Sequence, residues 1–220
     1  MEQAFGKRRE AAVEVKAGAV RLKGILGLPA SMAGVVLFAH GSGSGRLSPR
    51  NTFVAHMLQD GGLATLLIDL LEEREADDRR KVFDIDLLAD RLLAATEWLA
   101  QEPLTKGFQF GYFGASTGAG AALQAAARAP ASVAAVVSRG GRPDLAAPYL
   151  PQVKAPTLLI VGGHDAPVIQ MNEEALALLA CPKELVIVPG ATHLFDEPGT
   201  LEDVAVLARR WFLRYIPDSA

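Results

Sequence analysis

The sequence contains a single cysteine, Cys181, so the chain can form neither an intrachain disulfide nor a cysteine metal cluster. It also lacks a hydrophobic run approaching the ~18 residues of a membrane-spanning helix. The charged start, Met1–Glu10, has no apolar stretch of the length that a signal peptide needs. These absences exclude a disulfide-stapled scaffold and a membrane protein, and they predict a cytoplasmic protein in which Cys181 is a packing residue.

The sequence also lacks a large excess of either positive or negative charge. The 22 basic and 25 acidic residues are well mixed and give a net charge of −3, which argues against a nucleic acid or an anionic membrane as partner. With 220 residues, half of them hydrophobic, the chain is long enough for one buried core and short for two. We therefore expect a single domain, residues 1–220, that acts on a small molecule; the sequence does not indicate an oligomeric state.

Hydrophobic periodicity predicts an α/β fold. Alternating residues on either side of the turn Ala17–Ala19 indicate an antiparallel hairpin. From residue 34 onward, apolar strands alternate with helical patterns, which is typical of a mostly parallel sheet with helices on both faces. The expected strands of this sheet are residues 35–39, 63–69, 107–113, 133–138, 157–162 and 184–188.

Capping signals place several helices. The first should begin after Ser48 as N-cap, with Pro49 in its first turn, and end at Gly61. A second carries apolar residues over 88–99, and the last begins near Thr200.

The sequence also predicts a solvated loop and the absence of a cap domain. Residues 72–81 carry dense charges of both signs and are interpreted as a solvated loop. Residues 139–156 are too few for a helical cap domain over the site. We therefore expect an open site lined by loops.

The most informative motif is the pentapeptide Gly114–Gly118, which follows an apolar run and opens an alanine-rich helix. This is the setting of a nucleophile elbow, a sharp turn whose flanking glycines avoid clashes between strand and helix. It makes Ser116 the candidate nucleophile. The alternative is a tight glycine turn with an unreactive serine.

An aspartate and a histidine follow later strands in the chain order that this arrangement requires. Asp165 comes after the apolar run 157–161, and His193 after the run 185–188. His193 is the candidate general base, and Asp165 would hold its imidazole in the useful tautomer. Asp165 could instead cap the helix that follows it, in which case Asp144 is the second choice of acid.

The glycine-rich loop His40–Gly45 follows the strand at 35–39 and can turn backbone N–H groups toward one point. We expect the N–H groups of Ser42 and Thr117 to form an oxyanion hole. His40 would brace this loop. Of the other histidines, His164 is expected to pack locally and His56 to lie on a helix surface.

Four arginines lie near the expected pocket, and each could hold a substrate carboxylate or form a structural ion pair. Arg46 and Arg139 are taken as candidate substrate-binding residues, and the sequence leaves both roles open for Arg50 and Arg142 as well. Asp196 and Glu197 lie too close in sequence to His193 to be first choices as catalytic acid, and could line the site.

The elbow, the ordered Asp165 and His193, and the loop at His40–Gly43 together resemble the α/β-hydrolase superfamily over nearly the whole chain, and most of all its small dienelactone-hydrolase-like branch. The resemblance implies an α/β-hydrolase fold without a cap domain. Dienelactone hydrolases proper carry a cysteine nucleophile at the elbow, whereas this sequence has Ser116, which favours ordinary ester chemistry.

These features predict a serine hydrolase that cleaves a small carboxylic ester or lactone through an acyl-enzyme, without a cofactor or a metal. A thioesterase would use the same residues, and a non-catalytic ligand-binding protein of the same fold is a third possibility. A metal hydrolase is disfavoured because the four histidines include no pair at ligand spacing.

Overall fold

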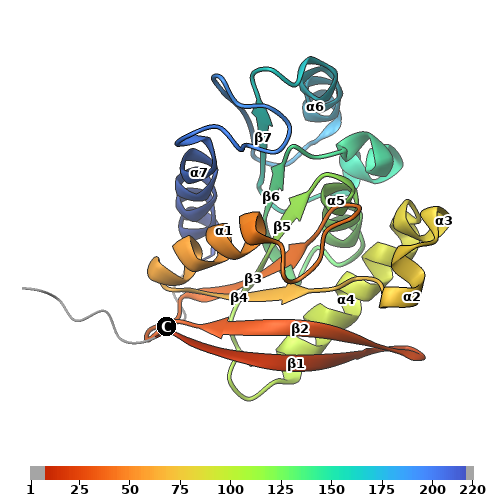
Figure 1. The fold of residues 1–220 in the computed structure, drawn as a ribbon, viewed down its shortest axis with the longest axis vertical. Coiled ribbons are helices and arrows are strands. Elements are labelled where there is room, and N and C mark those ends of the chain that lie inside the picture. The colour runs from red at the N-terminus through yellow and green to blue at the C-terminus, as the bar shows by residue number, and fades with distance from the viewer. Residues whose placement is uncertain (1–7, 217–220) are drawn as a thin grey trace, which may run out of the picture.

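The computed structural model describes residues 8–216, so the start and end of the chain, residues 1–7 and 217–220, lie outside it. Eight strands form one sheet in the order β1-β2-β4-β3-β5-β6-β7-β8. Figure 1 shows the hairpin of β1 and β2 at one edge of this sheet. Strand β2 runs antiparallel to both β1 and β4, and the remaining neighbours are parallel. The strands are β1 (Arg9–Ala17), β2 (Val20–Leu28), β3 (Gly34–Ala39), β4 (Leu63–Ile68), β5 (Phe110–Ala115), β6 (Val133–Arg139), β7 (Thr157–Gly162) and β8 (Lys183–Val188).

Helices connect the strands and cover both faces of the sheet (Figure 1). They are α1 (Pro49–Asp60), α2 (Glu73–Ala76), α3 (Arg79–Val82), α4 (Ile85–Gln101), α5 (Thr117–Arg128), the 3-10 helix η1 (Pro143–Gln152), α6 (Ala166–Leu178) and α7 (Thr200–Tyr215). The predicted cap of α1 is confirmed, because the Ser48 side chain accepts the N–H of Asn51 at 3.4 Å and Pro49 opens the helix.

The sheet separates two hydrophobic cores. One lies under α1 and α7, where Leu58 and Phe212 are fully buried against the strands. The other lies under α4, α5 and α6, and includes Leu92 and Leu123. Strands β3 to β7 are therefore covered on both faces, which explains their continuous apolar runs. The predicted α/β-hydrolase architecture, with its N-terminal hairpin, is confirmed.

Strand β5 differs from its prediction. Its expected start at residue 107 is wrong, because Gly107 has φ +90° and the N–H of Phe108 is donated to Thr105 O in a turn. Pairing with β6 continues instead through Gly114 and Ala115, up to the candidate nucleophile. The strand therefore delivers Ser116 directly at the carboxyl edge of the sheet.

The charged stretch 72–81 is not the solvated loop that its composition predicts. It contains α2 and α3, and Glu75 is buried, because its carboxylate receives two hydrogen bonds from the buried Arg91 on α4, at 2.6 and 2.9 Å. Lys81 adds a third at 2.8 Å. This ion pair lowers the pKa of Glu75 to about 2 and fastens the segment to α4.

The connection from β6 to β7 contains the 3-10 helix η1 and no cap domain. Two prolines, Pro148 and Pro151, lie inside it, and Ala146 departs from helical φ/ψ. The segment packs against α5 and α6.

Candidate active site

Ser116 occupies a strained turn between β5 and α5. Its φ of 51° and ψ of −123° lie where non-glycine residues are rare. A methyl group at Gly114 would lie 2.5 Å from the Cα atom of Ala119, and one at Gly118 would collide with the carbonyl oxygen of Ala39. Both glycines therefore have the steric role that the motif predicts.

His193 and Asp165 are brought together by the neighbouring strands β7 and β8. The Nδ1 atom of His193 lies 2.6 Å from Oδ2 of Asp165, and the Asp165 carboxylate makes no capping hydrogen bond to α6. The alternative role of this side chain as a helix cap is therefore wrong. Asp165 has 14% and His193 has 41% of the side chain exposed, so the imidazole faces solvent while its partner is covered.

The end of β6 lies between Ser116 and the loop that carries His193. The carbonyl of Arg139 accepts the N–H of Ser116 at 3.3 Å. The next residue, Gly140, has φ +50°, and a methyl group there would lie 3.2 Å from His193 O and 3.5 Å from its Nδ1. Ser116 and His193 thus flank one short segment. Within residues 8–216 their side chains are not joined by a hydrogen bond, and the contact between them stays a prediction.

The glycine-rich loop after β3 lies directly against Ser116. A methyl group at Gly41 would lie 2.8 Å from the Cβ atom of Ser116. In the described part of the chain, the N–H groups of Ser42 and Thr117 are not donated to any other protein group. Free donors next to the nucleophile are what an oxyanion hole requires.

His40 holds this loop in place, as the sequence predicts. Its Nε2 accepts the N–H of Leu70 at 2.9 Å, and its Nδ1 lies 3.0 Å from the carbonyl oxygen of Gly41. Burial lowers the pKa of His40, which favours the neutral imidazole that can accept from Leu70. The loop is therefore attached to the end of β4.

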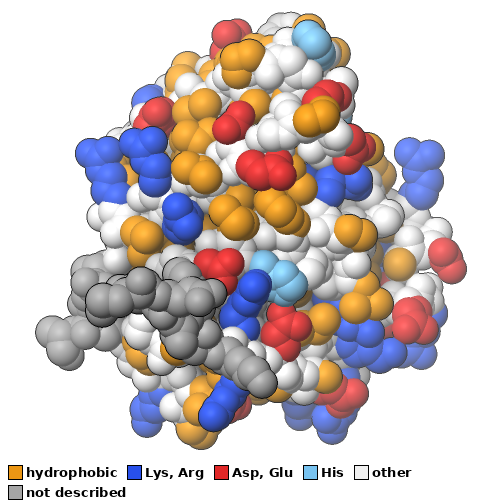
Figure 2. All heavy atoms as spheres, turned by 60° about the vertical axis from the view of Figure 1, so that its left-hand side comes forward, with side chains coloured by type: hydrophobic (Ala, Val, Ile, Leu, Met, Phe, Trp, Pro, Cys, Tyr) orange, Lys and Arg blue, Asp and Glu red, His pale blue; other side chains and the backbone are white. Residues whose placement is uncertain are grey.

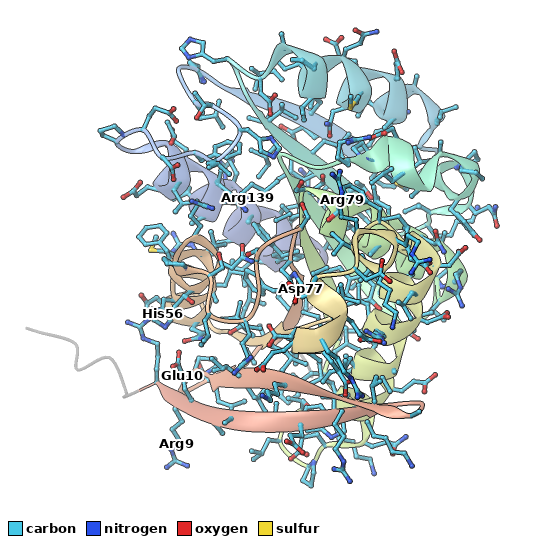
Figure 3. The ribbon with its side chains drawn as sticks, turned by 45° about the vertical axis from the view of Figure 1, so that its right-hand side comes forward. Arg9, Glu10, His56, Asp77, Arg79 and Arg139 are labelled. Atoms are coloured by element: carbon cyan, nitrogen blue, oxygen red, sulfur yellow. The ribbon has the colours of Figure 1, made fainter. Side chains whose placement is uncertain are left out.

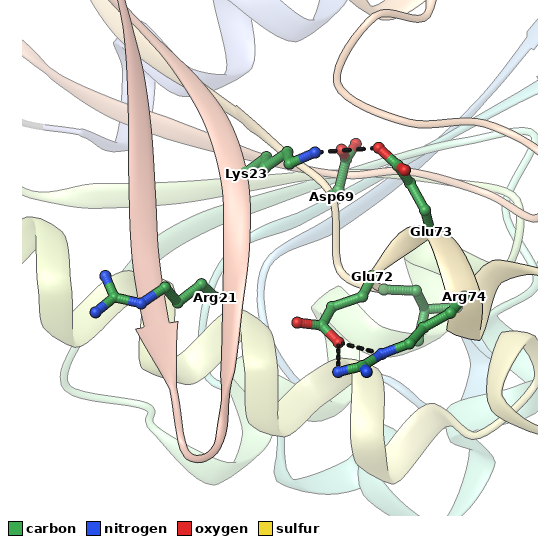
Figure 4. Close-up of a pocket in the computed structure, with 7 residues that line it drawn as sticks. Arg21, Lys23, Asp69, Glu72, Glu73 and Arg74 are labelled. Carbon is green, nitrogen blue, oxygen red and sulfur yellow. Dashed lines mark hydrogen bonds and ion pairs between the residues drawn. The ribbon is translucent and has the colours of Figure 1, made fainter.

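A cavity of about 630 Å³ opens beside the loop His40–Arg50 and reaches Thr117. Its lining combines apolar side chains, such as Leu71, Val82 and Leu88, with charged ones, such as Arg46, Asp69 and Glu73. A second cavity, of about 340 Å³, lies between β2 and α2 and is lined by none of the predicted site residues. Two ion pairs lie within its lining, Lys23 with Glu73 and Arg74 with Glu72 (Figure 4). The first cavity is the candidate substrate pocket.

Three of the four arginines near the site are paired with carboxylates. Arg46 donates to Asp69 through its backbone N–H and its guanidinium, Arg142 makes two hydrogen bonds to Asp144, and Arg50 pairs with Asp196 at 3.2 Å. Asp144, the second choice of acid, is thus held by Arg142, and Arg46 lines the cavity while tied to Asp69. Its contact with substrate stays a prediction.

Arg139 is different, because it is buried at the end of β6, at the carboxyl edge of the sheet. Only 8% of the residue is exposed, and its Nε and Nη1 atoms are buried without a hydrogen-bond partner among residues 8–216. The guanidinium carbon lies 6.0 Å from the centroid of the Phe195 ring. Burial, with a smaller contribution from Arg50, lowers the pKa of Arg139 to about 10.

Glu197 and His164 hold the loops around Asp165 and His193, and His56 lies away from these loops. Glu197 accepts the N–H of Thr192 at 3.0 Å, which folds the loop around His193 and lowers the pKa of Glu197. The backbone N–H of His164 donates to Ala191 O and ties the Asp165 loop to the His193 loop. His56 pairs with Glu10 on the surface, far from the site (Figure 3).

The sequence did not indicate that Gly41 and Gly140 let the backbone pass close to Ser116 and His193. The signal available was a glycine within two residues of the end of a buried strand, which can mark a close backbone approach. Nothing in the sequence marks Phe195, a buried residue with φ +57°. Among the described residues, no three His, Cys, Asp or Glu side chains gather where they could hold a metal ion, and no helix is long and apolar enough to cross a membrane. Chemistry without a metal or a cofactor stays a prediction.

This sheet, with a serine on a strained turn after β5 and an Asp-His pair after β7 and β8, defines an α/β-hydrolase. The sequence model of the dienelactone hydrolase family matches residues 26–212, and the chain belongs to that family. A dienelactone hydrolase from Anabaena variabilis ATCC 29413 is 60% identical, with a TM-score of 0.93 over 96% of this chain and 100% of the other.

Two further similarities differ in what they cover. A putative phosphoribosyl transferase of Mycobacterium tuberculosis is 56% identical over 208 residues, which are 94% of this chain and 47% of that protein. The chain therefore spans about half the length of this curated relative. Est1E from Butyrivibrio proteoclasticus has a TM-score of 0.80 at 16% identity, over 93% of this chain and 98% of the other, a likeness that concerns the fold alone.

Proposed function

We propose that this member of the dienelactone hydrolase family is a serine hydrolase that cleaves a small carboxylic ester or lactone. The observation that carries the proposal is the strained Ser116, at φ 51° after the end of β5, at the same edge of the sheet as the His193 that is hydrogen-bonded to Asp165. A serine hydroxyl is a poor nucleophile at neutral pH and needs a general base. His193, oriented by Asp165, is the group that would supply it.

In the proposed mechanism, Ser116 Oγ attacks the ester carbonyl carbon while His193 takes the hydroxyl proton. The N–H groups of Ser42 and Thr117 stabilise the tetrahedral oxyanion, with Thr117 at the positive end of α5. The C–O bond to the alcohol then breaks, and His193 returns the proton to the leaving oxygen. A water molecule hydrolyses the acyl-Ser116 ester by the same route and regenerates the free serine.

Substrate identity is limited by the pocket and by the nucleophile. A serine in place of the cysteine of the dienelactone hydrolases proper favours an ordinary ester, and the apolar side chains in the cavity lining suit a short acyl chain. A thioester would need the same residues. We do not extend the transferase name of the Mycobacterium relative to this chain, because about half of that protein lies outside the match.

The expectations on partners and location remain proposals. We propose a small-molecule substrate, without nucleic acid, membrane or cofactor. On the described part of the face in Figure 2, acidic and basic side chains are interspersed, which fits that proposal. A cytoplasmic location is expected from the sequence.

The test is hydrolysis of p-nitrophenyl esters of increasing acyl length by the wild type and by Ser116→Ala, together with labelling by a fluorophosphonate read by mass spectrometry. We expect turnover that disappears in Ser116→Ala and a label on Ser116, and the chain-length profile measures the pocket. Thioesters of the same acyl groups distinguish the thioesterase. No turnover of either series and no label would reject the hydrolase and favour a ligand-binding protein.

A further inference from the structure

Arg91 on α4 is a buried cation that is not one of the candidate catalytic residues. Only 6% of the residue is exposed. Its guanidinium donates two hydrogen bonds to the Glu75 carboxylate, at 2.6 and 2.9 Å, and another to the backbone carbonyl of Leu70 at 2.7 Å. Arg91 therefore joins α4 to two other segments of the chain, the helix α2 and the turn that follows β4.

The contact with Leu70 leads to the candidate oxyanion loop. Leu70 accepts from Arg91 through its carbonyl oxygen and donates its own N–H to Nε2 of His40 at 2.9 Å. The other ring nitrogen of His40 lies 3.0 Å from the carbonyl oxygen of Gly41, which packs against Ser116. A single residue, Leu70, thus connects Arg91 to the histidine that holds the loop, and each hydrogen bond in such a buried chain supports the next.

The contact with Glu75 leads to one wall of the candidate substrate cavity. Glu75 lies in α2 and also accepts from Lys81 in α3 at 2.8 Å, so its carboxylate fastens both helices beside α4 (Figure 1). Residues 73–82, which we call the α2–α3 wall, line the cavity with Ala76 and Val82 among others. Each of these helices has only four residues, too few to be stable without tertiary contacts. The position of the wall therefore depends on the ion pair.

We propose that Arg91 is a positioning residue for the candidate active site, acting on the oxyanion loop through Leu70 and His40 and on the α2–α3 wall through Glu75. The inference rests on the proposed hydrolase function and adds a determinant of its rate and of its acyl-chain preference. Arg91 touches no substrate in this role. Oxyanion donors stabilise the transition state only when they are accurately placed, so a shifted loop lowers kcat, whereas a shifted wall changes which acyl chain fits.

The competing interpretation is that the ion pair serves stability alone. Removal of one partner from a buried pair is strongly destabilising, because it leaves an uncompensated charge. Activity would then follow stability in every variant. The two contacts of Arg91 separate these interpretations, since the donor to Leu70 can be removed while the charge balance is restored.

Arg91→Met and Glu75→Gln form a matched pair. Both break the ion pair, but only Arg91→Met removes the donor to the Leu70 carbonyl. We expect kcat on p-nitrophenyl acetate, measured well below the Tm of each variant, to fall at least tenfold in Arg91→Met with little change in KM, and by threefold at most in Glu75→Gln. Thr96→Val removes a buried hydrogen bond to Tyr112 from the same helix and should lower the Tm without lowering kcat.

The acyl-length profile tests the wall. The ratio of kcat/KM on p-nitrophenyl octanoate to that on the acetate should rise at least threefold in Arg91→Met and in Glu75→Gln, because a wall that is no longer fastened admits a longer chain. Thr96→Val should leave this ratio unchanged. Glu75→Gln tests the wall even if Arg91→Met fails to fold, since its amide oxygen still accepts from Arg91, and an unchanged ratio would overturn this part of the proposal.

A double variant separates position from stability. Glu75→Met combined with Arg91→Met replaces the buried ion pair by apolar side chains, an exchange that often preserves or raises stability. We expect its Tm to be close to that of the wild type and its kcat to stay at least tenfold low, because the Leu70 carbonyl still lacks its donor. Wild-type kcat in the double variant would overturn the link to the oxyanion loop.

Amide hydrogen exchange makes the test independent of turnover. The Leu70 N–H, which His40 accepts, should exchange at least tenfold faster in the double variant than in the wild type and in Thr96→Val, as measured by NMR. An unchanged exchange rate would overturn the link between Arg91 and His40.

The outcomes separate the two proposals. Hydrolysis by the wild type, with unchanged kcat and unchanged acyl ratio in the Arg91 variants, overturns the positioning role and leaves the hydrolase intact. A fall in kcat without a change in the ratio overturns the link to the wall alone. Absence of hydrolysis and of labelling by the wild type overturns the hydrolase, and the exchange of the Leu70 N–H then decides the structural link by itself.

Discussion

The Nδ1 atom of His193 lies 2.6 Å from Oδ2 of Asp165, although the two residues follow different strands and are 28 positions apart. A carboxylate in this position fixes Nδ1 as the protonated nitrogen and leaves Nε2 free as a base. The preceding strands, β7 and β8, are paired in parallel from Thr157 with Lys183 to Gly162 with Val188. This register brings the two loops to the same height.

Asp165→Asn should lower kcat on p-nitrophenyl esters by about 10³- to 10⁴-fold, because the amide no longer enforces the useful tautomer of His193. Steady-state kinetics at neutral pH measure the effect. Asp144→Asn is the control, since its carboxylate is held by Arg142 and it was the second candidate for the acid. A greater loss in Asp144→Asn would contradict the assignment.

Gly140→Ala and Gly190→Ala form a matched pair. Both glycines have positive φ, 50° and 75°, so alanine is strained at either position by about 1 kcal/mol. Only at Gly140 would the new methyl group meet another residue, 3.2 Å from His193 O. We expect similar losses of thermal stability in the two variants, and a fall in kcat only in Gly140→Ala. Equal kcat values would show that Gly140 does not position His193.

His40→Phe should loosen the candidate oxyanion loop. The variant leaves the Leu70 N–H without its acceptor, at a cost of about 1–3 kcal/mol in the free energy of unfolding. Displacement of the loop should also lower kcat roughly ten- to hundredfold, because the oxyanion donors depend on exact placement. His40→Gln keeps an acceptor and should retain more of both properties. If kcat is the same in His40→Phe and wild type, the loop does not depend on this anchor.

The Glu75–Arg91 ion pair should make stability sensitive to acid. The pair lowers the pKa of Glu75 from 4.5 to about 2, so the folded protein binds fewer protons than the unfolded chain between these values. Its stabilising contribution is complete above pH 4.5 and is lost as the pH falls toward 2. The Tm of the wild type should therefore decrease across this window more steeply than that of Glu75→Gln.

At neutral pH, Glu75→Gln should cost about 3 kcal/mol in the free energy of unfolding, since it leaves Arg91 buried without its charge partner. Glu73→Gln removes an exposed carboxylate from the same helix and should change the Tm little, because surface ion pairs contribute at most about 1 kcal/mol. Parallel acid profiles for Glu75→Gln and wild type would contradict the assignment of the acid sensitivity to Glu75.

Patterns close together in the chain predicted most of the fold. Three local signals, each confined to a short stretch of sequence, are confirmed. They are the apolar run before Gly114, the Ser48-Pro49 cap and the alternation around residues 17–19. The predicted bounds of β5 were shifted toward the N-terminus. The turn at Gly107 and the last pair with β6, at Ala115, depend on contacts with neighbouring segments of the chain. Local periodicity does not carry that information.

Pairing between distant charges could not be predicted. The charged stretch 72–81 has the composition of a solvated loop, and only the position of Arg91 on α4 shows why Glu75 is buried. The same holds at the candidate site. Four arginines had equal claims from the sequence, and the fold separates them by the aspartates that it places beside three of them. Arg139 differs from the other three because, among the described residues, it has no carboxylate partner, and the sequence alone does not show this.

In the proposed mechanism, the left-handed turn at Ser116 serves the reaction at a cost in folding stability. A non-glycine residue at φ 51° and ψ −123° raises the free energy of the native state by about 1–3 kcal/mol, and glycine in its place would relieve the strain while removing the hydroxyl. A screen of random variants for heat resistance alone would therefore enrich substitutions that abolish turnover. Selection in the living cell for a working enzyme is what would keep this turn in the chain.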